Sequence, residues 1–120
     1  MRIEDIIVKI KLASDEQKQK GMLGFAKIKI PSDFEGYGKK YIVIKGIMVW
    51  GRSQFHDGVK GYCSVSPPCQ PKAGRKPFYL VFFEDENFDR DDVFWKALSG
   101  YILMTYYNTV DHREESNNRL

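Results

Sequence analysis

The chain has 120 residues, of which 42% are hydrophobic and 29% charged, and these values favour one folded domain over a disordered chain. Its net charge of +3 allows a polyanionic partner without requiring one. No apolar run reaches the roughly 20 residues that cross a bilayer, and residues 1–12 lack the continuous apolar stretch of a signal peptide. We therefore expect a cytoplasmic protein with no membrane span.

Alternating apolar and polar positions predict two strands near the N-terminus, at residues 3–12 and 22–30. In the first, Ile6, Val8, Ile10 and Leu12 share one face and Lys9 and Lys11 share the other. In the second, Gly24, Ala26, Ile28 and Ile30 alternate with Phe25, Lys27 and Lys29. Residues 14–21 are predicted as a loop. Pro31 is predicted to end the second strand, because proline removes a donor from the ladder, and residues 31–40 are then a loop rather than a tight hairpin.

Residues 41–50 form the most apolar segment and are predicted as the central strand. Gly46 in the middle of this segment indicates a bulge or a close approach of another backbone segment. Such a bulge would move the inward-facing set from Ile42 and Ile44 to Ile47 and Val49. Two further strands are predicted at residues 62–65 and 78–83, with surface loops at 51–60 and 70–77.

The apolar period changes to that of an amphipathic helix after Arg90. Its apolar positions are Phe94, Ala97, Leu98, Tyr101, Ile102 and Thr105. Asp89, Asp91 and Asp92 lie at the start, where they are predicted to cap the helix, with a metal site as the alternative. Residues 1–108 then form a single α+β domain, a mostly antiparallel sheet of about five strands with one C-terminal helix, and residues 109–120 form a polar flexible tail.

No enzyme signature is present in the sequence. It contains no glycine-rich phosphate loop, no nucleophile elbow and no metalloprotease helix. Cys63 and Cys69 are expected to be free thiols, and a thiol enzyme that uses one of them is the remaining catalytic alternative. Two cysteines and two distant histidines do not form a metal-ligand pattern. We therefore expect no catalysis and no cofactor.

Positive charge gathers between residues 52 and 76, where a single acidic residue, Asp57, accompanies five basic ones. These are Arg52, Lys60, Lys72, Arg75 and Lys76. Lysines and arginines neutralise phosphates, and the interleaved Phe55 and Tyr62 can stack on unpaired bases. We expect Lys27, Lys29 and Lys45 of the sheet to contribute to the same site. The alternative is that these charges only keep a sheet edge soluble and that the aromatic residues lie in the core.

Four segments resemble, in order and spacing, the SpoVG family of bacterial septation and sporulation regulators. They are IEDIIV at 3–8, GFAKIKI at 24–30, YIVIKGIMV at 41–49 and GYCSVSPP at 61–68, and the likeness extends over residues 1–107. The resemblance implies a sheet with a C-terminal helix, a homodimer joined through strands, binding to DNA or RNA, and roles in septation, sporulation or gene regulation. Two features depart from the family. The helix here begins with acidic residues, whereas the family's helix usually carries basic residues. The predicted loops at 14–21 and 31–40 are longer than those of the compact family members.

The leading hypothesis is thus a non-enzymatic nucleic-acid-binding regulator of the SpoVG type. The alternative is a protein-interaction module of the division machinery, with division or sporulation proteins as partners and no direct nucleic-acid role.

Overall fold

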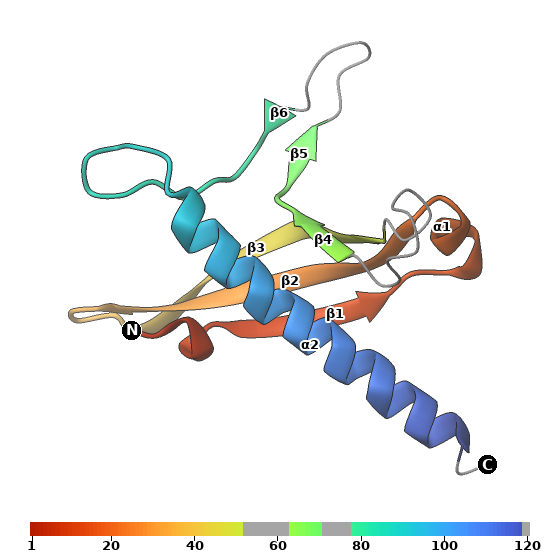
Figure 1. Cartoon of the computed structure of the whole chain (residues 1–120). Coiled ribbons are helices and arrows are strands. Elements are labelled where there is room, and N and C mark those ends of the chain that lie inside the picture. The colour runs from red at the N-terminus through yellow and green to blue at the C-terminus, as the bar shows by residue number, and fades with distance from the viewer. Residues whose placement is uncertain (52–62, 71–77, 119–120) are drawn as a thin grey trace.

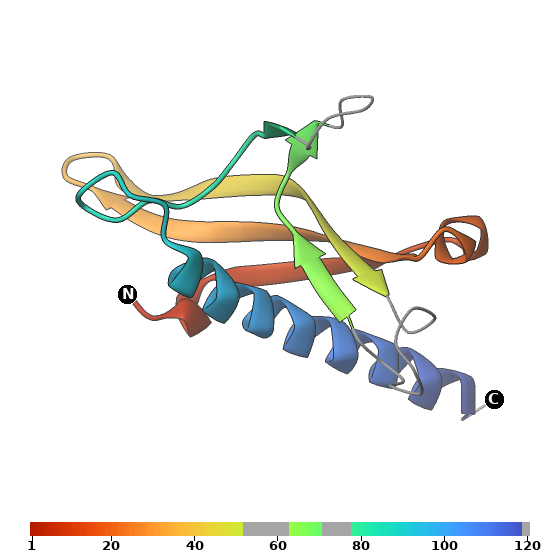
Figure 2. The same cartoon turned by 45° about the horizontal axis from the view of Figure 1, so that its top comes forward.

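The structure, a computed structural model, describes residues 1–51, 63–70 and 78–118 and has an α+β fold (Figure 1). Its main sheet is antiparallel with the strand order β1-β2-β3-β4, and α2 crosses one face of it (Figure 2). In chain order the elements are η1 (Ile3–Asp5), β1 (Ile7–Leu12), α1 (Asp15–Gln19), β2 (Met22–Phe34), β3 (Gly38–Gly51), β4 (Cys63–Ser66), β5 (Cys69–Gln70), β6 (Phe78–Tyr79) and α2 (Asp92–Asn118). The predicted class is confirmed, with four strands in the main sheet rather than about five.

The N-terminal segment differs in detail from the prediction of one strand over residues 3–12. Residues 3–5 form a 3-10 turn, in which the Arg2 backbone N–H donates to the Asp5 carboxylate over 2.9 Å, and the strand begins at Ile7. Within β1 the exposed and half-buried positions alternate as predicted. The predicted loop at 14–21 holds the short helix α1, which Ser14 and Gln17 cap reciprocally.

The β2–β3 hairpin is longer than the sequence indicated, and the prediction that Pro31 ends its strand is wrong. β2 runs on to Phe34, and Pro31 pairs with Tyr41 of β3. β1 pairs with β2 only as far as Lys29, so beyond that point β2 has a strand neighbour on one side only. Proline is tolerated at such an edge position. The predicted loop at 31–40 is therefore mostly paired strand that closes in a tight turn.

The predicted bulge at Gly46 is confirmed. Ala26 pairs with Ile47 and Ile28 pairs with Ile44, so two residues of β3, Lys45 and Gly46, oppose one residue of β2. Gly46 has a φ of +86°, in the left-handed region that glycine adopts readily. The bulge changes which side chains of β3 face α2, and Ile47 and Val49 beyond it are both fully buried.

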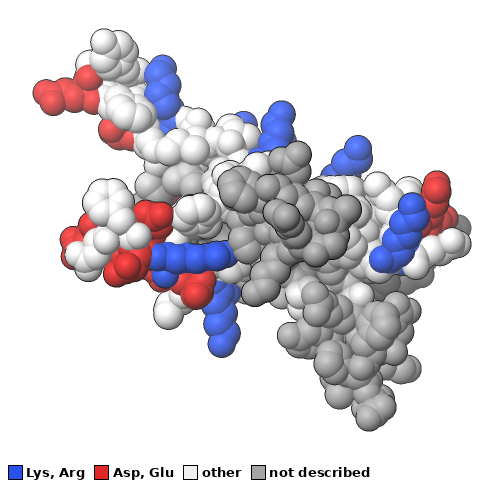
Figure 3. Space-filling model, turned by 90° about the horizontal axis from the view of Figure 1, so that it is seen from above, with Lys and Arg blue, Asp and Glu red and all other residues white. Residues whose placement is uncertain are grey.

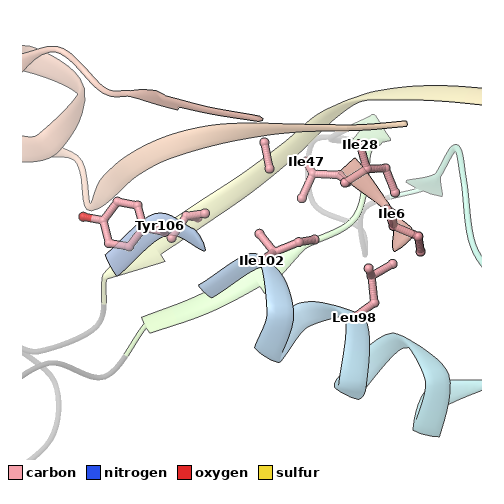
Figure 4. Packing of buried hydrophobic residues seen from close by; sticks show 8 residues of the cluster. Ile6, Ile28, Ile47, Leu98, Ile102 and Tyr106 are labelled. Atoms are coloured by element: carbon pink, nitrogen blue, oxygen red, sulfur yellow. The ribbon is translucent and has the colours of Figure 1, made fainter. Parts of the chain in front are cut away.

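The hydrophobic core lies between α2 and the sheet (Figure 4). Leu98, Ile102 and Tyr106 of α2 pack against buried aliphatic residues of the sheet, among them Ile28 and Ile47. The predicted stripe is largely correct, although Ala97 is exposed and Tyr106 is buried instead. A helix with this spacing presents one apolar face, and that face sets the side on which the sheet is covered.

The ends of two C-terminal elements differ from their predicted ranges. α2 continues to Asn118, so residues 109–118, predicted as a flexible tail, are helical and the expected boundary at 108 falls inside the helix. The strand predicted at 78–83 is only the two-residue β6. Across the part of the chain that is described, no helix is both long and apolar enough to cross a membrane.

Candidate nucleic-acid interface

Five lysines from three neighbouring strands lie on the face of the sheet opposite α2. Side chains alternate along each strand, and the residues between the core positions therefore point away from the helix. The five are Lys9 and Lys11 of β1, Lys27 and Lys29 of β2, and Lys45 of β3. We call this group the lysine face.

The register of the sheet brings the lysines close together. Lys9 lies directly opposite Lys27 in the β1–β2 ladder, and Lys45 occupies the bulge that opposes Lys27 from β3. Directly opposed residues of an antiparallel pair have Cβ atoms only about 4.5–5.5 Å apart, and like charges in this arrangement are destabilising. The repulsion between the opposed ammonium groups does not stabilise the folded protein, and a bound anion would reduce this repulsion.

The lysines of the lysine face have no ion-pair partner among the residues that the structure describes. Of the residues that the structure describes, only Arg90 and Asp92 form an ion pair, over 3.5 Å, and none of the five lysines takes part in one. In Figure 3 several basic side chains project along the upper edge of the molecule, and acidic side chains lie toward its two ends, where further basic side chains accompany them.

A shallow hollow of about 550 Å³ opens on the lysine face. Four of the lysines line it together with one aromatic ring and the bulge glycine: Lys9, Lys11, Lys27, Lys45, Phe25 and Gly46. Phe25 is partly exposed and lies outside the hydrophobic core cluster that packs under α2. The hollow therefore combines ammonium groups with an apolar ring.

A second aromatic residue lies further along the same face. Tyr41 is 43% exposed, and the Lys29 and Lys39 ammonium nitrogens lie 5.9 Å and 5.6 Å from the centroid of its ring. Both distances fall within the range of cation–π attraction. From the hollow toward the tip of the hairpin, Lys27 and Lys29 thus lie between two aromatic residues, Phe25 and Tyr41.

The sequence predicted only part of this arrangement. Lys27, Lys29 and Lys45 were expected at the site and lie on one face, but Lys9, Lys11 and Phe25 were not assigned to it. The outward positions of β1 and β2 carried the missing signal, since antiparallel pairing makes them neighbours. The five basic residues predicted in the loops lie outside the described residues, namely Arg52, Lys60, Lys72, Arg75 and Lys76. The same holds for Phe55 and Tyr62.

The acidic segment at 84–92 supports local structure. The Asp91 carboxylate accepts the Phe94 backbone N–H over 2.9 Å and so caps α2 as predicted, and the Asp85 carboxylate accepts the N–H groups of Asn87 and Asp89. Among the described residues, no three or more histidine, cysteine, aspartate or glutamate side chains are placed to hold a metal ion.

Cys63 is a free thiol that lies beside two tyrosines of α2. A hydrogen bond with Cys63, with a smaller contribution from burial, raises the pKa of Tyr107 to about 12. Burial raises the pKa of Tyr106, with a further contribution from Cys63. These shifts keep both phenols protonated at neutral pH and bring no proton transfer into the physiological range.

Comparisons of the chain with protein-family models, with curated proteins and with solved structures find no match.

Proposed function

We propose that the protein is a non-enzymatic, cytoplasmic regulator that binds DNA or RNA through the lysine face. The observation that supports this proposal is the convergence of five lysines from three strands, with no acidic partner among the described residues. The resemblance of four sequence segments to the SpoVG family points the same way, because that family binds nucleic acid. It also suggests that the regulated process is septation, sporulation or gene expression.

The proposed mechanism is neutralisation of phosphates with little reading of base edges. Lysine is a flexible point charge that suits phosphate contact, and it lacks the planar fork with which arginine reads guanine. The apolar side of α2 packs against the sheet, so this side of the helix is not available to enter a major groove. If all five lysines contact phosphates, the slope of log affinity against log salt is about −3.5 for a single strand and about −4.5 for a duplex.

The test is fluorescence anisotropy with labelled nucleic acid between about 50 and 200 mM salt, the range over which counterion release is large. The variant Lys9→Gln/Lys27→Gln/Lys45→Gln removes three charges from the lysine face. We expect it to bind much more weakly and to flatten the salt slope by about 2 to 3. The matched control, Lys18→Gln/Lys20→Gln/Lys96→Gln, removes three exposed charges elsewhere and should bind nearly as the wild type does.

Equal losses in the two triple variants would mean that net charge, and not this face, attracts the nucleic acid. Absence of wild-type binding at low salt would refute the proposal altogether. The basic residues predicted in the loops are tested separately by changing Arg52, Lys72, Arg75 and Lys76 to Glu.

A protein-interaction module is the second candidate, and the segment that leads into α2, together with the first turn of that helix, supports it. Four large apolar side chains are exposed there among acidic residues: Leu80, Phe82, Phe88 and Val93. Exposed apolar groups with a polar surround are typical of protein contacts. The test is the variant Phe88→Ser/Val93→Ser. Loss of binding to a partner protein of the division or sporulation machinery, with nucleic-acid binding unchanged, would favour this function.

We also propose that the protein forms a homodimer, as the family resemblance implies. In the main sheet β1 is an edge strand, and an edge strand carries unpaired backbone groups that can pair with a second chain. Sedimentation equilibrium should then give twice the 14.0 kDa mass of the chain, and a single-chain mass would refute the dimer.

A further inference from the structure

We infer that the lysine face binds a single strand of DNA or RNA, with an unpaired base stacked on the Phe25 ring inside the hollow. This inference rests on the proposed function and specifies the form of nucleic acid and the residue that selects it.

Phe25 lies opposite Lys11 of β1 and Met48 of β3, on the face that α2 does not cover. A single exposed aromatic residue has no special meaning on a protein surface. This ring, however, lines a hollow together with four lysines, and it contributes nothing to the core under α2. The hollow therefore presents an aromatic ring beside the positive charge of the lysines.

The side chains that line the hollow restrict the kind of ligand that it can bind. Lysine side chains only donate hydrogen bonds, so the charged lining calls for a ligand rich in acceptors and negative charge. The Phe25 ring calls for a flat apolar part in the same ligand. A nucleotide with its base unpaired has both, a phosphate for the ammonium groups and a π-face for the ring.

A duplex cannot use this arrangement fully. Its bases are stacked on one another, and a ring on a sheet surface reaches their faces only if a base leaves the stack. A duplex would therefore contact the lysines alone. A single strand adds the base–aromatic contact to the same phosphate contacts.

The distance along β2 between Phe25 and the position opposite Tyr41 sets the length of the proposed site. Tyr41 pairs with Pro31, six residues along β2 from Phe25, which corresponds to about 20 Å at the rise of a strand. Lys27 and Lys29 lie between the two rings on the same face. At the spacing of about 3.4 Å per nucleotide of a stacked strand, this length spans about six nucleotides. That value lies within the site sizes of about 4–16 nucleotides known for single-strand binders.

The experiment measures anisotropy of labelled oligothymidine and oligouridine of about 12 nucleotides, and of a mixed-sequence duplex, at about 50 mM salt. The variant Phe25→Leu keeps an apolar side chain but removes the ring. Phe34→Leu is the matched control, because Phe34 is exposed near the hairpin tip and does not line the hollow. Phe25→Trp keeps a stacking surface, and circular dichroism confirms that each variant is folded.

We expect the wild type to bind the single strands more tightly than the duplex. Phe25→Leu should weaken single-strand binding roughly 5- to 160-fold, the range for loss of one base–aromatic stack, and leave duplex binding within about twofold. Phe25→Trp should retain single-strand affinity, and Phe34→Leu should change neither. The oligothymidine and oligouridine arms show whether DNA or RNA is preferred.

Two other results would overturn the inference in distinguishable ways. If Phe25→Leu leaves single-strand binding unchanged while the triple glutamine variant of the lysine face abolishes it, stacking is refuted and phosphate binding stands. If the wild type binds neither single strand nor duplex, the inference and the proposed function both fail.

Discussion

Gly46 allows a sharp test of the fold, because the same substitution at another glycine should have the opposite effect. Gly46 has a φ of +86°, and a Cβ added there would meet Pro68 at 3.6 Å, an ordinary contact distance. Gly46→Ala should therefore add no clash, and its effect comes from holding an alanine in the left-handed region. That conformation costs about 1–2 kcal/mol for a residue with a Cβ.

Gly100 lies in the interior of α2, in its N-terminal half, and an added Cβ there meets nothing within 4 Å. Gly100→Ala should stabilise the protein by up to about 1 kcal/mol, the difference in helix propensity between the two residues.

The assay for both variants is the free energy of unfolding from urea denaturation. The free energy of unfolding should be higher for Gly100→Ala than for the wild type and lower for Gly46→Ala. The m-values should be unchanged if the unfolded states are alike. If Gly46→Ala is as stable as the wild type, the left-handed residue does not enforce the bulge and the account of the shift in β3 is wrong.

Two further predictions concern the ends and contacts of α2. Asp91→Ala removes the acceptor of the Phe94 N–H and should destabilise the protein by about 0.5–2 kcal/mol in urea denaturation, while Asp91→Asn should retain most of the stability. Equal stability of the alanine variant and the wild type would contradict the cap. The pKa of Tyr107 is raised from 10.0 to about 12 in the folded state, so the unfolded chain loses this proton first and stability should fall as the pH rises from about 10 toward 12. Tyr107→Phe should reduce the loss of stability between about pH 10 and pH 12, and an unchanged loss would refute this linkage.

Local patterns in the sequence predicted most of the elements. Alternation identified the inner faces of β1 and β2, and the glycine within an apolar run predicted the bulge that turns Ile47 and Val49 inward. The three-to-four spacing after Arg90 predicted the stripe of α2. These features depend on backbone geometry and burial over short stretches, which adjacent residues determine.

Element ends were less predictable, because they depend on neighbours distant in the sequence. A proline disrupts a strand that is paired on both sides, because it has no backbone N–H to donate. β2 continues through Pro31 because the pairing of β1 with β2 has already ended at Lys29. Residues 109–118 are mostly polar, and they nevertheless extend α2, in which Val110 packs against the core.

The candidate site shows the same division. The sequence by itself determined that Lys9, Lys11, Lys27 and Lys29 occupy the polar side of their strands, because side chains alternate along a strand. Only the tertiary structure decided that Lys9 opposes Lys27, that the bulge brings Lys45 beside them, and that Phe25 lies among them. The register of two ladders and one bulge decides this, and a shift by one residue would move each of these side chains to the opposite face.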